Sequence, residues 1–204
     1  MRTDWYWIRQ GCIAQDPGRY SGRLDLPTLP PGAVVARRLA SRLPNGAVWI
    51  SSPAQRARAS VRALNETANA IHVDDFADQD LGLWAGRRRA EVHKANPQID
   101  WSQPSLVQPE GGESFGDVIE RVAGAIQRLT LHYPDRPLIV VTHAPVIRAA
   151  LVLALDLPEE NGHLLDVAPF SLTHLSWEGP DDMEADAADR QGVWRMHHAN
   201  LTMG

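Results

Sequence analysis

Short runs of apolar and β-branched residues recur along the chain, and the segments between them carry apolar residues at helical spacing. The most apolar run reads LIVVT, which is typical of a strand buried on both faces of a sheet. The same reasoning predicts strands over Trp5–Arg9, Ala47–Ser51, Ile71–Asp74, Leu138–Thr142, Ser171–Trp177 and Val193–His198.

Helices are predicted between these strands. The first should follow Ser52, which is expected to be its N-cap, with Pro53 as its first residue and Gln55 completing a capping box. Its apolar positions recur at helical spacing and comprise Ala57, Val61, Leu64 and Ala68.

Two further amphipathic patterns come later in the chain. Ser114 is expected to start one helix, and Pro145 should open another directly after His143. The apolar face of the helix after Ser114 comprises Phe115, Val118, Ile119, Val122, Ala123, Ile126 and Leu129. The apolar face of the helix after His143 comprises Val146, Ile147, Ala150, Leu151 and Ala154.

The alternation of strands and helices predicts an α/β protein with a mostly parallel sheet covered on both sides. The last two strands are joined by GPDDMEADAADRQG, which leaves no room for a crossover helix and is interpreted as the solvated tip of a hairpin. Residues 78–112 have few strand signals and many turn residues, so they are interpreted as an excursion over one end of the sheet. No repeat or linker divides residues 1–204, and a single domain is expected.

Composition narrows the class of protein. The chain has 204 residues, of which 44% are hydrophobic and 22% charged, as expected for a globular domain with a large core. No apolar run approaches the roughly 18 residues that span a bilayer, and no signal peptide is evident. The net charge of −5 disfavours general binding of nucleic acid. The single cysteine, Cys12, excludes an internal disulfide and a cysteine-based zinc site, so a cytoplasmic location is expected.

Polar residues follow three of the predicted strands. Arg9 and Gln10 end the first strand, Arg56 lies on the first turn of the helix after the second, and His143 follows LIVVT. Ligands of open α/β sheets bind outside the carboxyl ends of the strands, where helix N-termini also direct backbone N–H groups. Because arginine can grip two phosphate oxygens at once, this set predicts a phosphate-binding site.

Five segments stand in a familiar order: RQG at residues 9–11, then SSPAQRARAS, DQDLGLWAGR, PEGGESFGDVIERV and VTHAPVIRA. Together they resemble the histidine phosphatase superfamily, also called the phosphoglycerate mutase-like family. The resemblance extends from residue 5 to about residue 177. Short members, such as alpha-ribazole phosphatases and broad phosphomonoesterases, are the most similar. The resemblance implies a three-layer α/β/α sandwich, a small phosphorylated substrate or ligand, and chemistry that needs no metal or cofactor.

The resemblance also implies roles for single residues. In this family a first histidine attacks phosphorus and becomes phosphorylated, and Gln10 occupies its position. Two arginines and a second histidine hold the phosphoryl group, and they correspond to Arg9, Arg56 and His143. An acidic residue protonates the leaving oxygen, and Asp78 stands where glutamate is usual. The next candidate for this acid is Glu113.

Gln10 is the main departure from the family pattern. An amide nitrogen delocalises its lone pair into the carbonyl, so Gln10 can exchange hydrogen bonds with a phosphoryl group but cannot carry one. The protein is therefore interpreted as a phosphate-ester-binding member without turnover. The alternatives are a weak phosphatase that uses direct attack by water and an active phosphatase into which the glutamine was introduced. A flavodoxin-like cofactor-binding module is an alternative from another class.

The remaining cysteine, histidine and arginine residues of note are not assigned to the catalytic chemistry. Cys12 and His143 are disfavoured as replacement nucleophiles, because no helix pattern begins at Cys12 and His143 would require a reversed phosphate. His197 and His198 are adjacent in a predicted strand, so their side chains are expected on opposite faces, and with His174 they are assigned hydrogen-bonding or surface roles. The run Arg87–Arg89 is interpreted as the exposed start of a helix, with an anion-recognising rim as the alternative.

Overall fold

The computed structural model describes residues 1–13, 18–179 and 192–204. At its centre is a six-stranded sheet with the strand order β3-β2-β4-β1-β5-β6. Four neighbouring strands, β3, β2, β4 and β1, are parallel, whereas β5 is antiparallel to β1 and to β6. The prediction of a mostly parallel sheet is therefore confirmed. The strands are β1 (Arg2–Arg9), β2 (Val48–Ser51), β3 (Ile71–His72), β4 (Leu138–Thr142), β5 (Leu172–Glu178) and β6 (Val193–Leu201).

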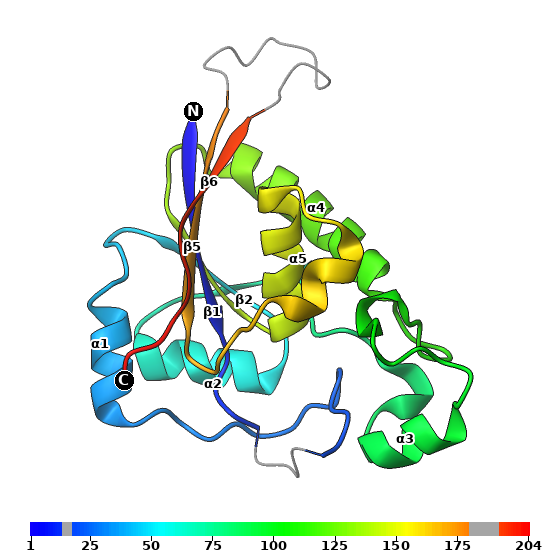
Figure 1. The fold of residues 1–204 in the computed structure, drawn as a ribbon. Coiled ribbons are helices and arrows are strands. Elements are labelled where there is room, and N and C mark those ends of the chain that lie inside the picture. The colour runs from blue at the N-terminus through cyan, green and yellow to red at the C-terminus, as the bar shows by residue number, and fades with distance from the viewer. Residues whose placement is uncertain (14–17, 180–191) are drawn as a thin grey trace.

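Helices cover both faces of the sheet, which gives the expected three-layer sandwich (Figure 1). Alternating side chains of β1 serve two separate cores. Trp5 and Trp7 pack with residues of α4 and α5, whereas Ile8 packs with residues of α1 and α2. β4 is buried at every position, as the run LIVVT predicts. The helices are α1 (Ala33–Ala40), α2 (Gln55–Leu64), α3 (Arg89–Ala95), α4 (Phe115–His132) and α5 (Ala144–Leu155).

Residues 78–112 contribute no strand to the sheet. They contain α3 and two short 3-10 helices at Gly82–Trp84 and Pro104–Leu106. Figure 1 shows α3 at the end of the sheet where β1 ends. The segment therefore lies where it can shape a site at the carboxyl ends of the parallel strands.

The start of α2 differs from the prediction. The helix begins at Gln55 rather than Pro53, its N-cap is Ala54, and no side chain of that cap forms a hydrogen bond. The predicted capping box is therefore wrong. Gln55 N donates instead to Asp25 Oδ1 at 2.8 Å, so a carboxylate distant in the sequence satisfies the first helical amide. The hydroxyl of Ser52 accepts a hydrogen bond from Ala54 N at 3.3 Å and also contacts a buried histidine at the site.

The other helix ends follow the sequence more closely. Ser114 is the N-cap of α4 and forms a reciprocal capping box with Asp117, which confirms the predicted start. Pro145 lies in the first turn of α5, where a missing N–H costs nothing. By contrast, α2 ends at Leu64, so Ala68 lies beyond the helix.

The pairing of β5 with β6 contains an irregularity. His174 pairs with His198, whereas the next residue, Leu175, pairs with Met196, so His197 is the extra residue of a β-bulge. The ring of His197 stacks on that of His174 with centroids 4.2 Å apart, and the ring centroid of His198 lies 5.6 Å from His174. The prediction that His197 and His198 face opposite sides is wrong, because the bulge breaks the simple alternation of the strand.

The predicted tip of this hairpin falls on residues 180–191, which lie outside the described residues. Within the described part of the chain, no helix combines the length and the apolar character that crossing a membrane requires.

Candidate active site

Parallel strands bring the predicted residues to one end of the sheet. Arg9 is the last residue of β1 and lies beside Thr142, the last residue of β4. Gln10 and His143 follow them, and Gln10 N donates to Thr142 O at 2.8 Å. Arg56 comes from the first turn of α2, which follows β2. The residues predicted for phosphate binding therefore meet at the carboxyl ends of neighbouring strands.

Asp78 joins two of these residues. Its Oδ2 lies 2.9 Å from Arg56 Nη2 and 3.3 Å from His143 Nδ1. Arg56 also donates to the carbonyls of Leu24 at 2.6 Å and Gly22 at 2.7 Å, and its side chain is fully buried. A buried guanidinium persists only with such partners, so Asp78 compensates the deepest positive charge of the site.

His143 is the neutral member of the site at pH 7. Its side chain has no exposed surface. Burial lowers its pKa from 6.5 to about 4, while Asp78 opposes this shift and the nearby arginines reinforce it. Its Nε2 lies 2.7 Å from Ser52 Oγ. His143 therefore adds no positive charge of its own to the site, and both of its ring nitrogens face protein groups.

Arg9 and Gln10 complete the predicted set. Arg9 Nη1 donates to the carbonyl of Val167, and burial lowers the pKa of the guanidinium, which stays protonated at neutral pH. Gln10 is only 3% exposed. Within the described ranges, Arg9 Nε, Gln10 Oε1 and Arg56 Nε have no hydrogen-bond partner, and His143 Nδ1 has only the 3.3 Å contact with Asp78. Arg9, Gln10 and Arg56 thus each have one buried polar atom whose hydrogen-bonding capacity is unused.

A layer of charged residues holds the segment that carries Asp78. Arg23 Nε and Arg121 Nη2 donate to the Asp78 carbonyl at 3.0 Å and 3.3 Å. Glu113 lies between these two arginines, 2.8 Å from Arg23 and 3.0 Å from Arg121. It also accepts a hydrogen bond from Asp80 N at 2.9 Å. Glu113 is therefore engaged in supporting this segment, whereas the Asp78 carboxylate contacts Arg56 and His143.

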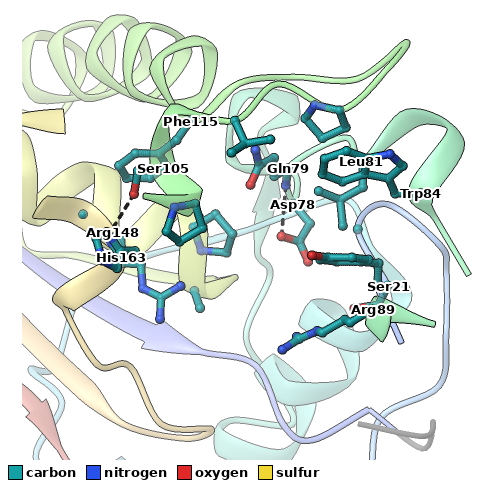
Figure 2. Close-up of a pocket in the computed structure, with 18 of the residues that line it drawn as sticks. Ser21, Asp78, Gln79, Leu81, Trp84, Arg89, Ser105, Phe115, Arg148 and His163 are labelled. Atoms are coloured by element: carbon teal, nitrogen blue, oxygen red, sulfur yellow. Dashed lines mark hydrogen bonds between the residues drawn. The ribbon is translucent and has the colours of Figure 1, made fainter. Parts of the chain in front are cut away.

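A cavity of about 550 Å³ opens beside these residues. Arg9, Gln10 and Asp78 line it, whereas Arg56, His143, Cys12 and Glu113 do not. Figure 2 shows side chains on two opposite sides of this cavity. On one side are Phe115, Ser105, Arg148 and His163, and on the other are Asp78, Gln79, Leu81, Trp84 and Arg89.

Several lining residues were missed by the sequence reasoning. Arg148 comes five positions after His143 in VTHAPVIRA, and its Nε donates to Leu165 O at 2.8 Å. Burial lowers the pKa of Arg148, and Arg9 acts in the same direction, so two guanidinium groups influence each other beside the cavity. The aromatic part of the wall comes from separate segments and comprises Tyr20, Trp84, His93 and Trp101.

The structure also shows where Arg87–Arg89 and Cys12 lie relative to the cavity. Arg88 is the N-cap of α3 and Arg89 its first residue, which confirms the predicted helix start. Arg89 lines the cavity, and its guanidinium carbon lies 5.4 Å from the ring centroid of Tyr20. Cys12 is exposed, and no helix begins at it, as expected.

Comparison with known proteins gives the family. The sequence profile of the Histidine phosphatase superfamily (branch 1) matches residues 3–185. A bifunctional protein of Mycobacterium tuberculosis is 37% identical over 141 residues, which cover 65% of this chain and 38% of that protein. The chain thus spans less than two fifths of that relative. A glucosyl-3-phosphoglycerate phosphatase of Mycolicibacterium vanbaalenii is 27% identical, and the match covers 92% of each chain.

A solved structure supports the same assignment at the level of fold. A mycobacterial glucosyl-3-phosphoglycerate phosphatase superposes with a TM-score of 0.83 at 24% identity, covering 99% of this chain and 100% of that chain. The family match excludes the flavodoxin-like alternative. Because the profile spans nearly the whole chain, including the site built from Arg9, Gln10, Arg56, Asp78 and His143, the chain belongs to the histidine phosphatase superfamily, branch 1.

Proposed function

We propose that this protein binds a phosphate ester beside Arg9 and Gln10 and that its phosphatase turnover is impaired. One observation carries the proposal: Arg9, Gln10 and Arg56 each have a buried polar atom without a hydrogen-bond partner among the described residues. Such an atom costs about 1–3 kcal/mol when it lacks a partner, so a group of them favours a polar ligand. Phosphate oxygens can accept hydrogen bonds from the arginines, and a protonated phosphate oxygen can donate to Gln10.

The negative charge of Asp78 affects how a phosphate ester can bind. Its carboxylate lies 2.9 Å from Arg56, where it competes with an approaching phosphate dianion. Binding should therefore be accompanied by uptake of a proton, at Asp78 or at neutral His143. A protonated Asp78 would also be suited to donate to a leaving oxygen, the role that the family pattern gives it.

The chemistry of Gln10 argues for impaired turnover. Its amide cannot form the phosphorylated intermediate that a histidine forms. In another covalent enzyme, loss of the nucleophile costs about a millionfold in rate, or roughly 8 kcal/mol of transition-state stabilisation. The hydrogen bonds to charged groups, at about 1.5–3 kcal/mol each, remain available for binding. Binding and turnover are therefore expected to be affected very differently.

A weak phosphatase is the second candidate. Two of the proteins named above are glucosyl-3-phosphoglycerate phosphatases, and Asp78 lies beside the candidate phosphate-binding groups. Cys12 does not line the cavity, and His143 is fully buried, so water is the nucleophile best placed to act. Glucosyl-3-phosphoglycerate, the compound named for one relative, belongs in the panel of phosphate esters to be tested.

The decisive experiment exchanges Gln10 for histidine. The unmodified protein should bind inorganic phosphate in calorimetry, yet hydrolyse para-nitrophenyl phosphate near background and form no acid-labile phosphoenzyme. Gln10→His should form the phosphoenzyme and gain several orders of magnitude in rate, because the remaining groups already surround this position. Gln10→Asn is the matched control and should stay inactive.

Two outcomes would contradict the proposal. Turnover by the unmodified protein at a typical enzyme rate of about 10 per second would show that Gln10 is tolerated. Absence of phosphate binding would remove the assigned site. A folded but inactive Gln10→His protein that still binds phosphate would leave binding in place and point to Asp78 as a second impaired part.

A further inference from the structure

Three polar side chains converge at the other end of β1, away from the cavity. Asp4, His174 and His197 each offer one ligand atom, and these atoms lie within 4.8 Å of one another. They come from the neighbouring strands β1, β5 and β6. Asp4 precedes Arg9 by five strand residues, or roughly 16 Å at the rise of an extended chain. This cluster is therefore separate from the phosphate site.

The β-bulge brings the third residue into the cluster. Asp4 and His174 lie close across the β1–β5 pair, with Asp4 Oδ1 2.8 Å from His174 Nε2. A regular β6 strand would present only one of its two adjacent histidines to this face. The extra residue re-aims His197, whose ring stacks on His174 at 4.2 Å. Bulges of this kind often serve to position a side chain at a site.

We propose that Asp4, His174 and His197 bind a divalent transition-metal ion such as Zn²⁺. Two imidazoles and one carboxylate are the three protein ligands of several zinc sites that keep an open fourth position. Metal–ligand bonds of about 2.0–2.2 Å place tetrahedral ligand atoms about 3.4 Å apart. A metal lies in the plane of each imidazole that binds it, so the exposed ring of His197 must turn out of its stack on His174 to bring the ligand atoms from within 4.8 Å to this spacing. The two imidazole donors favour zinc and its neighbours over magnesium.

The surroundings of the cluster favour this assignment. The ring of Tyr6 stacks on His174 at 4.2 Å and fixes the plane of that imidazole. Ser176 Oγ lies 2.9 Å from His197 Nε2 and offers a hydrogen-bond partner to the second imidazole.

The main competitor is Arg2. Its Nε and Nη2 each lie 3.1 Å from Asp4. The Arg2 side chain is 51% exposed, and exposed ion pairs contribute only about 0–1 kcal/mol. A metal can therefore share or displace this contact at little cost. The bound ion would link the edge strand β6 directly to β1, across β5.

The test uses tag-free protein, because an affinity tag of histidines would bind the same ions. Titration with Zn²⁺ in calorimetry should give one ion per chain, and Co²⁺ should develop the visible absorption of a low-coordinate complex. His197→Ala should weaken Zn²⁺ affinity about a hundredfold or more, since even supporting contacts of metal ligands account for 10–100-fold. His197 is exposed, so this variant is expected to fold. His174→Ala and Asp4→Asn should give similar losses.

His132→Ala, which removes an exposed histidine on α4, is the matched control and should keep full affinity. The result that would overturn the proposal is Zn²⁺ binding that is absent at millimolar ion, or that is equal in His197→Ala and the unmodified protein. Failure here would leave the phosphate site untouched, because no residue of that site takes part.

Discussion

Acid should destabilise this protein through His143 in particular. The fully buried imidazole has a pKa lowered to about 4 by burial, whereas in the unfolded chain it returns to about 6.5. Between these two values the unfolded state binds the extra proton and the folded state does not. The free energy of unfolding therefore falls as pH drops through this window, and it levels off below pH 4.

The two pKa values fix the size of the effect. Lowering the pH from 7 to 5 nearly saturates the unfolded imidazole with protons, while the folded one stays mostly neutral. The linkage relation then gives a loss of about 2 kcal/mol over this interval, with a ceiling of about 3 kcal/mol at lower pH. For a protein of this size, 2 kcal/mol corresponds to a fall in Tm of about 4–8 °C.

The assay compares urea unfolding of the unmodified protein and His143→Asn across this pH range, followed by tryptophan fluorescence. Other buried groups also titrate. Burial likewise lowers the pKa of His174 and of His198, so the total acid sensitivity should exceed 2 kcal/mol. Only the difference between the two proteins reports on His143, and it should shrink by about 2 kcal/mol as the pH falls from 7 to 5.

His132→Asn serves as the control, because His132 is exposed and its removal should leave the pH profile unchanged. Parallel pH profiles for His143→Asn and the unmodified protein, with equal m-values, would refute the reasoning. They would mean that the folded protein already accommodates a protonated His143 beside Asp78.

Two further variants test the charge pair and a helix cap. Asp78→Asn should lower stability by about 3 kcal/mol, because the buried Arg56 loses its carboxylate, and added phosphate should restore part of this loss in urea unfolding; no recovery with phosphate would contradict the binding role of Arg56. Ser114→Ala should cost about 1 kcal/mol, because Ser114 Oγ accepts a hydrogen bond from Asp117 N at 3.1 Å, while calorimetry should find phosphate affinity unchanged. A large loss of affinity would show that this cap also shapes the site.

The fold could be predicted where one local signal decides the structure. The strand Leu138–Thr142 is buried on both faces, so its apolar run coincides with its bounds. The 18-residue helix α4 has a long apolar face and a local cap. The helix Ala33–Ala40 was not predicted, because its eight residues bury only Leu39 and form no side-chain cap. Short helices depend on tertiary packing, which the local sequence does not reveal.

In the candidate site, too, some features could be predicted from the sequence and others depend on tertiary structure. The positions of Arg9, Gln10 and His143 follow from topology, because parallel strands end at one edge. The contact of Arg56 with the carbonyls of Gly22 and Leu24 could not be read from the sequence, since it depends on the path of a loop. The aromatic wall of the cavity is equally a product of tertiary structure. The bulge in β6 likewise could not be predicted, and it breaks the alternation of side chains at His197 and His198.

The proposed function assigns binding and catalysis to different residues. The positive charge of the site includes that of Arg9 and Arg56, whereas the family pattern gives the attack on phosphorus to the residue at position 10. Gln10 is fixed by its backbone N–H, which donates to Thr142 O at 2.8 Å whatever the side chain. Exchange of histidine for glutamine therefore removes the nucleophile without disturbing the arginines or the Asp78 contact that holds Arg56. Under the proposed function, phosphate affinity and turnover are expected to depend on different residues, so each can be changed while the other is measured.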